Sequence, residues 1–490
     1  MVVGEMVEEV DLVVIGAGPG GYTAAVKARE LGLKVMLVDK RKLGGGVCLH
    51  EGCIPSKSLL HVSHLINIAK EAGEIGVSYP AANIDLGKVR EHKNNVIKKL
   101  TQGLSGLFKM HKLEYIDGEA SFIDDRNIRI DRIGESAIRV KFKNAIIATG
   151  SKPSNLPPSI KLVNLNNQSK IMNSTQALEL NDIPQKLLVI GAGYIGLELG
   201  QVYASLGSSI DIVEFMDSLL PGLDSDLVRP LANKMKGLCN EIMLESLVTQ
   251  IEEKNDELLV TIQKPDKTTV VKKYDKILVS IGRTPNTSTL GLENLGLELN
   301  KSGFINVNEF GQTSLKRIFA IGDVVSNRPM LAHKAMREGH VVAEKLAGLN
   351  SAFDNRAIPC VVYTDPEIAW CGLTENEANK ANVNFAITKL PFVANGRAQS
   401  MANTQGLTKI LYDKTSQAII GCGIVGPSAG ELIGIMVLAM EMGCVIEDIA
   451  NTIFPHPTLS ETIMESALTV DNKELSSKVK NAEQILIKKL

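Results

Sequence analysis

The stretch Leu12-Val13-Val14-Ile15-Gly16-Ala17-Gly18-Pro19-Gly20-Gly21 runs from four apolar residues into a glycine-rich turn, and an alanine-rich segment follows it. The apolar run predicts a buried parallel strand, and the alanine-rich segment predicts a helix. Between two such elements, Gly16 permits a tight turn, Gly18 lets the backbone approach a pyrophosphate, and Gly21 lets helix and strand pack closely. The next predicted strand ends in Asp39, 23 residues after Gly16, where a carboxylate can accept hydrogen bonds from a ribose. This stretch predicts a Rossmann-like dinucleotide-binding domain.

The same pattern returns 175 residues further along the chain. A predicted strand, 186–190, leads into Gly191, Gly193 and Gly196, and the next predicted strand ends in Glu214, again 23 residues after the first glycine. Such a duplication predicts an α/β fold with two Rossmann-like domains and two bound dinucleotides. A carboxylate at Glu214 accepts hydrogen bonds from a ribose diol and repels a 2′-phosphate, so the second site favours NAD over NADP.

Two cysteines, Cys48 and Cys53, follow a run of three glycines, 44–46, and precede an amphipathic segment, 58–69. Backbone N–H groups and the dipole at the start of a helix favour a thiolate, so the pair can form an active, reducible disulfide. Residues five apart do not share a helix face, and a bridge between them requires a distorted first turn. Such a strained bridge is more easily reduced than a structural one. The other interpretations are a zinc half-site, for which we find no second pair at matching spacing, or two ordinary buried thiols.

A second informative stretch is Phe454-Pro455-His456-Pro457-Thr458-Leu459-Ser460-Glu461. The prolines on either side of His456 restrict its backbone to an extended form. If the carboxylate of Glu461 reaches the imidazole, it orients the ring and raises its basicity, which makes an acid/base dyad. Thr458 and Glu461 also fit a capping box, in which Glu461 only closes the start of a helix and His456 is a surface residue. Spacing alone favours capping, whereas a reactive thiol pair elsewhere in the chain, which needs a base, favours the dyad.

The chain has 490 residues, too many for one hydrophobic core, and its length predicts about two to four domains. Hydrophobic residues make up 44% and charged residues 22%, and the net charge of −2 gives no electrostatic reason to expect nucleic acid or an anionic membrane as a partner. The first residues carry Glu5, Glu8 and Glu9 rather than a targeting pattern, and no run approaches ~20 apolar residues. The seven cysteines are an odd number, which argues against a secreted disulfide scaffold. We therefore expect a cytoplasmic protein without a membrane-spanning helix.

These patterns divide the chain into four parts. Residues 1–151 would form the first dinucleotide-binding unit, which ends at a turn of small residues suited to close approach of a cofactor. Residues 152–281 would form the second, entered through a proline-marked linker, 152–184. Residues 282–352 would form a central part, and residues 353–490 alternate strands and helices without a glycine fingerprint, which predicts an α+β domain. The lysine-rich last residues read as a helical or frayed tail.

Taken together, the ordered motifs resemble the flavin disulfide reductase family, and within it the dihydrolipoamide dehydrogenases. The resemblance extends from Leu12 to about Val470 and includes the cysteine motif at 46–57, both fingerprints, Ala148-Thr149-Gly150, Gly282-Arg283, Gly322-Asp323 and the stretch 456–461. It implies FAD on the first fingerprint, completed by the central part, and NAD on the second. It also implies a head-to-tail homodimer, in which the C-terminal dimerisation domain lends its histidine to the partner's cysteines.

The resemblance further implies roles for single residues. Cys48 would exchange electrons with the substrate, and Cys53 would lie against the flavin. His456, held by Glu461, would take up the protons of the substrate. The activity so implied is the FAD-dependent oxidation of protein-bound dihydrolipoamide, with a Cys48–Cys53 disulfide as the redox group and NAD+ as the electron acceptor. The lipoyl group would arrive on a protein of a 2-oxo acid dehydrogenase complex or of the glycine cleavage complex, and the sequence does not distinguish between them.

Other residues would bind the two cofactors. Lys57 and Glu198 would pair near the flavin, although a solvated helix residue is the ordinary interpretation of Glu198. Tyr194 would cover the flavin until nicotinamide displaces it. The residues expected around FAD are Gly16, Gly18, Gly21, Asp39, Lys57, Gly118, Thr149, Gly150, Ser151, Asp323, Met330, Leu331, Ala332 and His333, and those expected around NAD or between the two cofactors are Gly191, Gly193, Tyr194, Gly196, Glu198, Glu214, Val248 and Gly282. No metal ligand is expected.

The chain departs from the family pattern beside the cysteines. The glycine run 44–46 is one residue longer than usual, and His50 and Glu51 replace the commoner asparagine and an uncharged residue. These changes lie between the predicted adenosine site and the thiols, where they could shift the redox potential or the access of substrate.

Three other interpretations remain open. Glutathione and trypanothione reductases resemble this plan but are an NADPH type, with arginines where Glu214 stands. Mercuric reductase carries a further C-terminal cysteine pair, whereas this sequence has no cysteine after Cys444. A non-enzymatic flavin-binding scaffold would not need two cysteines together with a histidine dyad.

Overall fold

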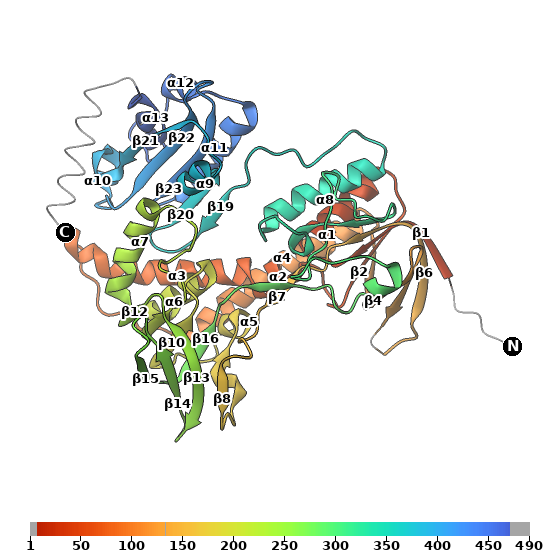
Figure 1. The fold of residues 1–490 in the computed structure, drawn as a ribbon, viewed down its shortest axis with the longest axis horizontal. Coiled ribbons are helices and arrows are strands. Elements are labelled where there is room, and N and C mark those ends of the chain that lie inside the picture. The colour runs from red at the N-terminus through yellow and green to blue at the C-terminus, as the bar shows by residue number, and fades with distance from the viewer. Residues whose placement is uncertain (1–6, 133, 471–490) are drawn as a thin grey trace.

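The computed structural model describes residues 7–132 and 134–470, and its first sheet has seven strands (Figure 1). Their order is β3-β2-β1-β6-β5-β4, and β18 pairs with β6. The strands are β1 (Val7–Ile15), β2 (Val35–Asp39), β3 (Glu114–Asp117), β4 (Glu119–Asp124), β5 (Asn127–Asp131), β6 (Ile138–Ile147) and β18 (Ile318–Ala320). β1, β2, β3, β6 and β18 are parallel, and β4 and β5 form antiparallel pairs. Leu12, Val13 and Val14 are fully buried, as expected for a parallel strand that is covered on both faces.

The helices of this first region place the predicted redox cysteines. α1 (Pro19–Glu30) and α8 (Ala332–Leu346) lie side by side in Figure 1, and a Cβ on Gly339 of α8 would lie 2.6 Å from the carbonyl O of Gly20. β2 is followed by α2 (Gly46–Glu51), α3 (Cys53–Glu71), η1 (Ala72–Ile75) and α4 (Leu86–Met110). α3 packs against α6 (Tyr194–Leu206) of the second region. The helix that begins at a predicted redox cysteine therefore also joins the two dinucleotide-binding regions.

The second region repeats the parallel arrangement. Its main sheet has the order β12-β11-β10-β16-β9, and a four-stranded sheet has the order β15-β14-β13-β8. α6 and α7 (Ser225–Leu238) belong to this region. The strands are β8 (Lys161–Val163), β9 (Ile171–Met172), β10 (Lys186–Ile190), β11 (Ser209–Val213), β12 (Glu241–Met243), β13 (Leu247–Lys254), β14 (Glu257–Gln263), β15 (Thr269–Tyr274) and β16 (Lys276–Val279).

Two of the predicted loops contain regular structure. The predicted linker 152–184 includes most of β7 (Ser151–Pro153), all of β8 and β9, η2 (Gln168–Lys170) and α5 (Ser174–Glu179). The predicted turn at 282–286 includes β17 (Arg283–Pro285), which pairs with β7. These short strands are stabilised by hydrogen bonds to partners distant in sequence, and a segment of two or three residues shows no periodicity from which to predict it.

The C-terminal region has one five-stranded antiparallel sheet, in the order β19-β20-β23-β22-β21. α11 contacts β20 and β23, and α13 contacts β21 and β22. The elements are β19 (Cys360–Val362), β20 (Ile368–Gly372), α9 (Glu375–Lys380), β21 (Phe385–Pro391), α10 (Gly396–Ser400), β22 (Leu407–Asp413), β23 (Ile419–Val425), α11 (Ala429–Met442), α12 (Ile446–Ala450) and α13 (Glu461–Leu468), with short 3-10 turns between some of them. Helices and an antiparallel sheet make this the α+β region that was predicted.

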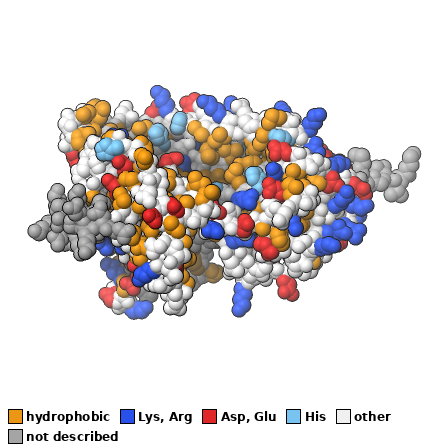
Figure 2. Space-filling model, turned by 90° about the horizontal axis from the view of Figure 1, so that it is seen from above, with side chains coloured by type: hydrophobic (Ala, Val, Ile, Leu, Met, Phe, Trp, Pro, Cys, Tyr) orange, Lys and Arg blue, Asp and Glu red, His pale blue; other side chains and the backbone are white. Residues whose placement is uncertain are grey.

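The predicted fold class, two Rossmann-like domains and a C-terminal α+β domain, is confirmed. The pairing of β18 with β6 supports a central part, 282–352, that completes the first unit, and the limits of the four parts stay predictions. The predicted lysine-rich tail lies beyond residue 470 and outside the described residues. Within residues 7–132 and 134–470, no helix is both long and apolar enough to span a membrane. Seen from above, the molecule has a hollow with hydrophobic side chains near its middle (Figure 2).

Candidate active site

The two predicted redox cysteines lie on either side of a helix break. α2 ends at Glu51, and α3 begins at Cys53 after Gly52, whose φ is −145° and ψ −112°. On one regular helix, residues five apart would point in different directions. The break instead allows the free thiols of Cys48 and Cys53 to form a hydrogen bond. The distorted helix start that the spacing required is present.

The two thiols hold their protons unequally. The pKa of Cys53 is lowered to about 7, mainly by the hydrogen bond from Cys48 and also by the ammonium of Lys57, while burial opposes both effects. The same hydrogen bond raises the pKa of Cys48 far above its usual range, and burial adds to the rise. Cys53 is exposed to an open pocket, although protein surrounds its other sides. Near neutral pH, Cys53 is therefore the thiolate, and Cys48 keeps a proton that a base must remove before it can act as a nucleophile.

Lys57 and Glu198 form the predicted pair close to Cys53. Lys57 Nζ lies 2.8 Å from Glu198 Oε2 and 3.1 Å from Oε1. The Glu198 carboxylate is buried and also accepts a hydrogen bond from the backbone N–H of Tyr363 at 3.0 Å. Lys57 Nζ lies 4.5 Å from the centre of the Tyr363 ring. This contact joins α3, α6 and the end of β19, and sequence analysis assigned no role to Tyr363.

A long pocket runs from the end of β2 to the thiols. The predicted site residues that line it are Gly16, Gly18, Asp39, Cys48, Cys53, Lys57, Gly118, Thr149, Gly150, Ser151, Tyr194, Glu198, Asp323, Met330 and Ala332. Arg41, Glu51, Arg283 and Asn286 also line it, although none of them was among the residues predicted to bind a cofactor. The fold therefore gathers residues from both dinucleotide-binding regions around one cavity that the thiol pair also lines.

The first glycine fingerprint shapes the wall of this pocket. Gly16 has a φ of +104°, and a Cβ there would lie 2.3 Å from the carbonyl O of Ala148. A Cβ at Gly21 would lie 1.7 Å from the carbonyl O of Gly16, so helix and strand touch as predicted. Gly18 faces the pocket, and the nearest atom to a Cβ there would be Gly46 Cα at 3.9 Å. A pyrophosphate can therefore approach the backbone at Gly18, and the wall fits the FAD that the motif predicts.

The carboxylates that end β2 and β11 are held in the same way. Asp39 accepts hydrogen bonds from the N–H groups of Ala17 at 2.6 Å and Arg41 at 2.9 Å. Glu214 accepts them from Ala192 at 2.6 Å and from the residue two positions beyond itself at 2.8 Å. Each carboxylate is thereby fixed beside its own glycine turn, where its remaining lone pairs suit ribose hydroxyls.

The second fingerprint repeats the first. Gly191 has a φ of +98° and a Cβ there would lie 2.6 Å from the carbonyl O of Ser280, while a Cβ at Gly196 would lie 2.2 Å from that of Gly191. A Cβ at Gly193 would meet no atom of the described residues within 4 Å, so the backbone is open to a pyrophosphate. Tyr194 directly follows Gly193, lines the pocket that also contains the thiols, and is 41% exposed. Protein around its hydroxyl raises the pKa of Tyr194 to about 12, so this group stays protonated between the two sites.

Asp323 is oriented by a short chain of hydrogen bonds. Ser151 Oγ donates to Asp323 Oδ2 at 2.6 Å, and Arg283 Nε donates to Ser151 Oγ at 2.7 Å. The buried carboxylate of Glu338, on α8, accepts the N–H of Gly322 at 2.7 Å. Arg283 was quoted as part of a motif but given no role, and Glu338 was not predicted. Arg283 follows a glycine that was singled out, whereas nothing in the local sequence connects Glu338 with the pocket.

Several predicted cofactor residues lie outside this pocket. The side chain of Val248 is 2% exposed and belongs to the hydrophobic core of the second region. His333 is exposed, and its Nε2 lies 2.7 Å from the carbonyl O of Pro359. Leu331 precedes α8 as its N-cap residue, and Gly282, with a φ of +117°, leads into β17. Their contacts with a cofactor stay predictions.

The carboxylate of Glu461 contacts both partners that the sequence left open, but Thr458 does not cap the helix. Its Oε1 lies 2.9 Å from His456 Nδ1, and its Oε2 accepts the N–H of Thr458 at 2.7 Å. α13 begins at Glu461 itself with Ser460 as the N-cap residue, so the helix starts later than the capping box predicts. His456 is 78% exposed, it does not line the pocket, and α13 lies in the C-terminal region away from α2 (Figure 1). Within one chain, His456 and Glu461 form a dyad that faces outward.

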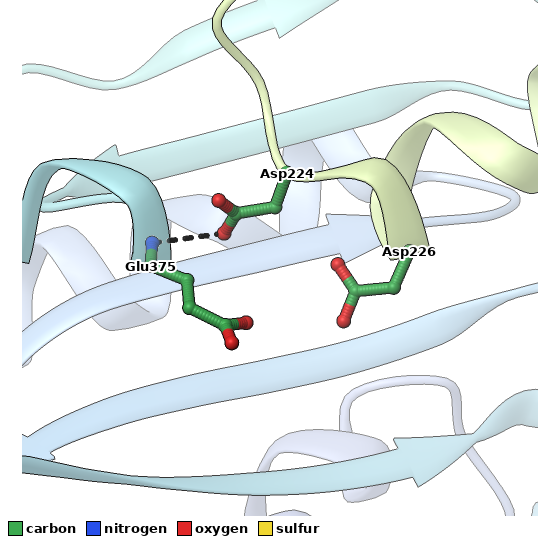
Figure 3. Close-up of side chains that lie close together, drawn as sticks. All are labelled: Asp224, Asp226 and Glu375. Atoms are coloured by element: carbon green, nitrogen blue, oxygen red, sulfur yellow. Dashed lines mark hydrogen bonds between the residues drawn. The ribbon is translucent and has the colours of Figure 1, made fainter. Parts of the chain in front are cut away.

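A cluster of acidic residues that resembles a metal site already contains a cation. The carboxylates of Asp224, Asp226 and Glu375 lie close together (Figure 3). The ammonium of the buried Lys409 lies 2.6 Å from Asp224, 2.8 Å from Asp226 and 3.2 Å from Glu375. This cluster connects the start of α7 with β22 and α9, so its role is to hold the second region against the C-terminal region.

Comparison with known proteins decides the family. Residues 10–339 match the family described as pyridine nucleotide-disulphide oxidoreductase, and residues 358–467 match the dimerisation domain of the same group. The chain belongs to the pyridine nucleotide-disulphide oxidoreductase family. It is 43% identical over 454 residues to a dihydrolipoyl dehydrogenase of Vibrio parahaemolyticus, and the aligned part covers 92% of this chain and 94% of that protein. It is 44% identical over 467 residues to a dihydrolipoyl dehydrogenase of Geobacillus stearothermophilus, which covers 95% and 97%.

Among solved structures, the HOCl-induced flavoprotein disulfide reductase RclA from Escherichia coli has a similar fold, with a TM-score of 0.81 and 26% identity over 94% of this chain and 100% of that one. The resemblance stated from the motifs is thus confirmed, with FAD and NAD as the cofactors of the family. The dimerisation match supports a homodimer, and it includes Leu438 and Met442 on α11, which are 65% and 74% exposed. The roles of the single site residues stay predictions.

Proposed function

We propose that this chain is a dihydrolipoyl dehydrogenase, which oxidises protein-bound dihydrolipoamide and passes the electrons through FAD to NAD+. The observation that carries this proposal is the hydrogen-bonded pair of Cys48 and Cys53 in a pocket that the first dinucleotide fingerprint also lines. The pyrophosphate would bind at Gly18 and the ribose at Asp39. Bound FAD would supply the relay between the thiol pair and NAD+.

The substrate dithiol and the Cys48–Cys53 disulfide exchange two electrons directly, and NAD+ is the final electron acceptor. In the oxidised protein, a base takes the proton of one substrate thiol, and the thiolate so formed attacks Cys48 of the Cys48–Cys53 disulfide, which breaks that bond and releases Cys53 as a thiolate. The second substrate thiolate attacks the mixed disulfide, closes the lipoamide ring and releases Cys48. The cysteine pair thereby gains two electrons, which later leave as the hydride that reduces NAD+ to NADH, and the pair closes again to a disulfide. One proton is released to solvent in each cycle.

The unequal pKa values of the two thiols suit this sequence of steps. A low pKa makes Cys53 a good leaving group, and the positive charge of Lys57 stabilises the thiolate so formed. Cys48 holds its proton strongly and therefore needs a base. We infer that this base is His456 of the partner subunit, kept in position by its Glu461, because the dyad faces outward and does not line the pocket of its own chain.

The substrate and acceptor follow from the second site and from the relatives. Glu214, fixed by two backbone N–H groups, would accept hydrogen bonds from a ribose diol and repel a 2′-phosphate. This favours NAD+ over NADP+, and so an NAD-dependent enzyme over an NADPH-dependent reductase. We propose that the dihydrolipoyl group is carried by a lipoylated protein of a 2-oxo acid dehydrogenase or glycine cleavage complex. A cytoplasmic location stays a prediction from the sequence.

A substrate comparison tests the proposal. FAD-loaded protein should reduce NAD+ with dihydrolipoamide, and lipoyl domains should be better substrates than the free amide. It should show little turnover with glutathione disulfide and NADPH. Rapid reduction of glutathione disulfide, or no turnover of dihydrolipoamide, would contradict the assignment. Cys53→Ser provides the matched control, because it should bind FAD and NAD+ but turn over neither substrate.

A further inference from the structure

The residues in which this chain departs from its family make specific contacts. The carboxylate of Glu51, at the end of α2, lies 2.7 Å from Arg41 Nη2, and the two side chains are 32% and 28% exposed. His50 Nε2 lies 3.0 Å from the carbonyl O of Gly44. Both unusual residues therefore reach back from α2 to the segment that leaves β2.

The far end of the ion pair is firmly anchored. The backbone N–H of Arg41 donates to Asp39 Oδ1 at 2.9 Å, and the hydroxyl of Tyr115 donates to the Arg41 carbonyl at 2.5 Å. The ring of Tyr115 stacks on Phe108, with 5.6 Å between ring centres. Arg41 is thus fixed to the residue predicted to bind the FAD ribose, and Glu51 is fixed to Arg41.

The long glycine run lets α2 lie against the first fingerprint. A Cβ on Gly44 would lie 2.9 Å from the ring of Phe108, and Gly45 has a φ of +123°. A Cβ on Gly46 would lie 2.5 Å from the Cα of Gly18, the residue at which a pyrophosphate would bind. Any outward movement of α2 would separate Gly46 from Gly18, and the Arg41–Glu51 ion pair opposes that movement.

We propose that Arg41 and Glu51 form a clasp at the rim of the FAD pocket, which holds α2 against the first fingerprint. Both residues line the pocket, and α2 carries Cys48. The clasp slows the release of FAD and limits access of reagents to Cys48 from solvent. Arg41 and Glu51 act by positioning α2, and the inference depends on FAD binding but not on the identity of the disulfide substrate.

The first test measures FAD release. Glu51→Gln keeps the shape of the side chain but removes its charge, so FAD should leave the holoenzyme about two- to fivefold faster, the effect expected of one partly exposed ion pair. Added KCl should accelerate release from the wild type and much less so from the variant, because salt screens a half-exposed pair. Arg41→Gln should act similarly, and the double variant should be no worse than the stronger single variant, because both changes break one interaction.

The charge-swapped variant Arg41→Glu/Glu51→Arg should regain part of the wild-type retention. Glu257→Gln is the matched control, because Glu257 and Lys273 form an ion pair of the same 2.7 Å length on the surface of the second region. That variant should release FAD like the wild type.

A second readout follows Cys48. After reduction with NADH in the absence of oxygen, Cys48 should react with iodoacetamide a few-fold faster in Glu51→Gln than in the wild type or in Glu257→Gln. A Glu51→Gln protein that unfolds at the wild-type temperature yet retains less FAD would support the clasp. Unchanged FAD release together with unchanged alkylation of Cys48 would overturn it, as would a charge swap that behaves like the sum of the single variants.

Discussion

Lys57 and Glu198 come from different dinucleotide-binding regions, yet the ammonium of Lys57 lies 2.8 Å from the carboxylate of Glu198. They act on Cys53 in opposite directions. The positive charge of Lys57 lowers the pKa of Cys53, and the negative charge of Glu198 raises it, while the hydrogen bond from Cys48 has the largest effect. The same ion pair therefore joins two regions of the fold and adjusts the ionisation of the thiol that faces the pocket.

Neutralising these two residues separately should shift the pKa of Cys53 in opposite directions. Lys57→Met should raise it above about 7, and Glu198→Gln should lower it. Each change should alter the ionisation constant by about tenfold, as expected when one charge close to a thiol is removed. Titrating the long-wavelength absorbance of the NADH-reduced holoenzyme measures the thiolate, which disappears as the pH falls through the pKa. Shifts in the same direction in both variants would contradict the opposing roles.

His456 should be needed for thiol chemistry but not for FAD binding. His456→Gln should lower kcat with dihydrolipoamide by about 10²- to 10⁴-fold, the range typical of a lost acid/base group. Glu461→Gln should have a smaller effect and displace the pH profile, because it weakens the contact that orients the imidazole but leaves the ring in place. Oxidation of NADH by an artificial one-electron acceptor, which needs no base at Cys48, serves as the control and should be nearly unchanged. Wild-type turnover of dihydrolipoamide by His456→Gln would contradict a catalytic role of the dyad. The contact of Glu461 with Thr458 would then be its only role.

The duplicated carboxylates offer a matched pair for testing nucleotide preference. Glu214→Ser should reduce the ratio of kcat/KM for NAD+ over that for NADP+ by about tenfold or more, because the repulsion of a 2′-phosphate is lost. Asp39→Ser should leave this ratio unchanged and instead weaken the retention of FAD, because Asp39 stands beside the first fingerprint. Steady-state kinetics with both nucleotides and the FAD content of each variant give the two readouts. Equal use of NADPH and NADH by the wild type would contradict the role of Glu214.

Lys409 should be required for stability because its ammonium is the cation shared by three carboxylates. Burial alone would lower the pKa of Lys409, but hydrogen bonds to Asp224 and Asp226 outweigh burial and raise it, so the side chain stays charged. Lys409→Ala should lower the free energy of unfolding by about 3–5 kcal/mol, since it leaves the buried carboxylate of Asp224 without its cation. Lys389→Ala, which removes the more exposed partner of Asp226, should cost at most about 1 kcal/mol.

The space left by the Lys409 ammonium should admit a cation. Manganese should raise the unfolding temperature of Lys409→Ala and leave that of the wild type unchanged, because only the variant offers the three carboxylates of Figure 3 to an ion. Equal stabilisation of both proteins would show that manganese binds elsewhere.

The parts of the site that were predicted from sequence are those in which local chemistry determines the geometry. Gly16 and Gly191 must adopt a positive φ beside a neighbouring strand, and the carboxylates of Asp39 and Glu214 follow at equal spacing. The glycine pattern and the spacing of the carboxylate therefore predict the whole unit, which consists of a strand, a turn, a helix and a terminal acidic residue. The spacing of the cysteines likewise required a distorted helix start, which the structure provides at Gly52.

The parts that were not predicted depend on residues far apart in the chain. β7 and β9 pair with β17 and β16 more than a hundred positions away, and each is too short to show a period. The contact of Arg283 with Ser151 likewise joins distant residues, whereas Arg41 and Glu51 are only ten positions apart and are brought together by the turn between β2 and α2. For Glu461, the spacing fitted both a contact with His456 and a contact with Thr458. It could not decide between them, because one carboxylate oxygen makes each contact.

The most direct test of the account is a count of reactive thiols during one turnover. FAD-loaded protein is mixed with one equivalent of dihydrolipoamide without oxygen, alkylated, and digested for mass spectrometry. Cys48 and Cys53 should both become labelled and the other five cysteines should not, and NAD+ added before the alkylating reagent should restore the unlabelled pair while NADH appears. Label that fails to appear on these two residues, or that persists there after NAD+ has been reduced, would contradict it.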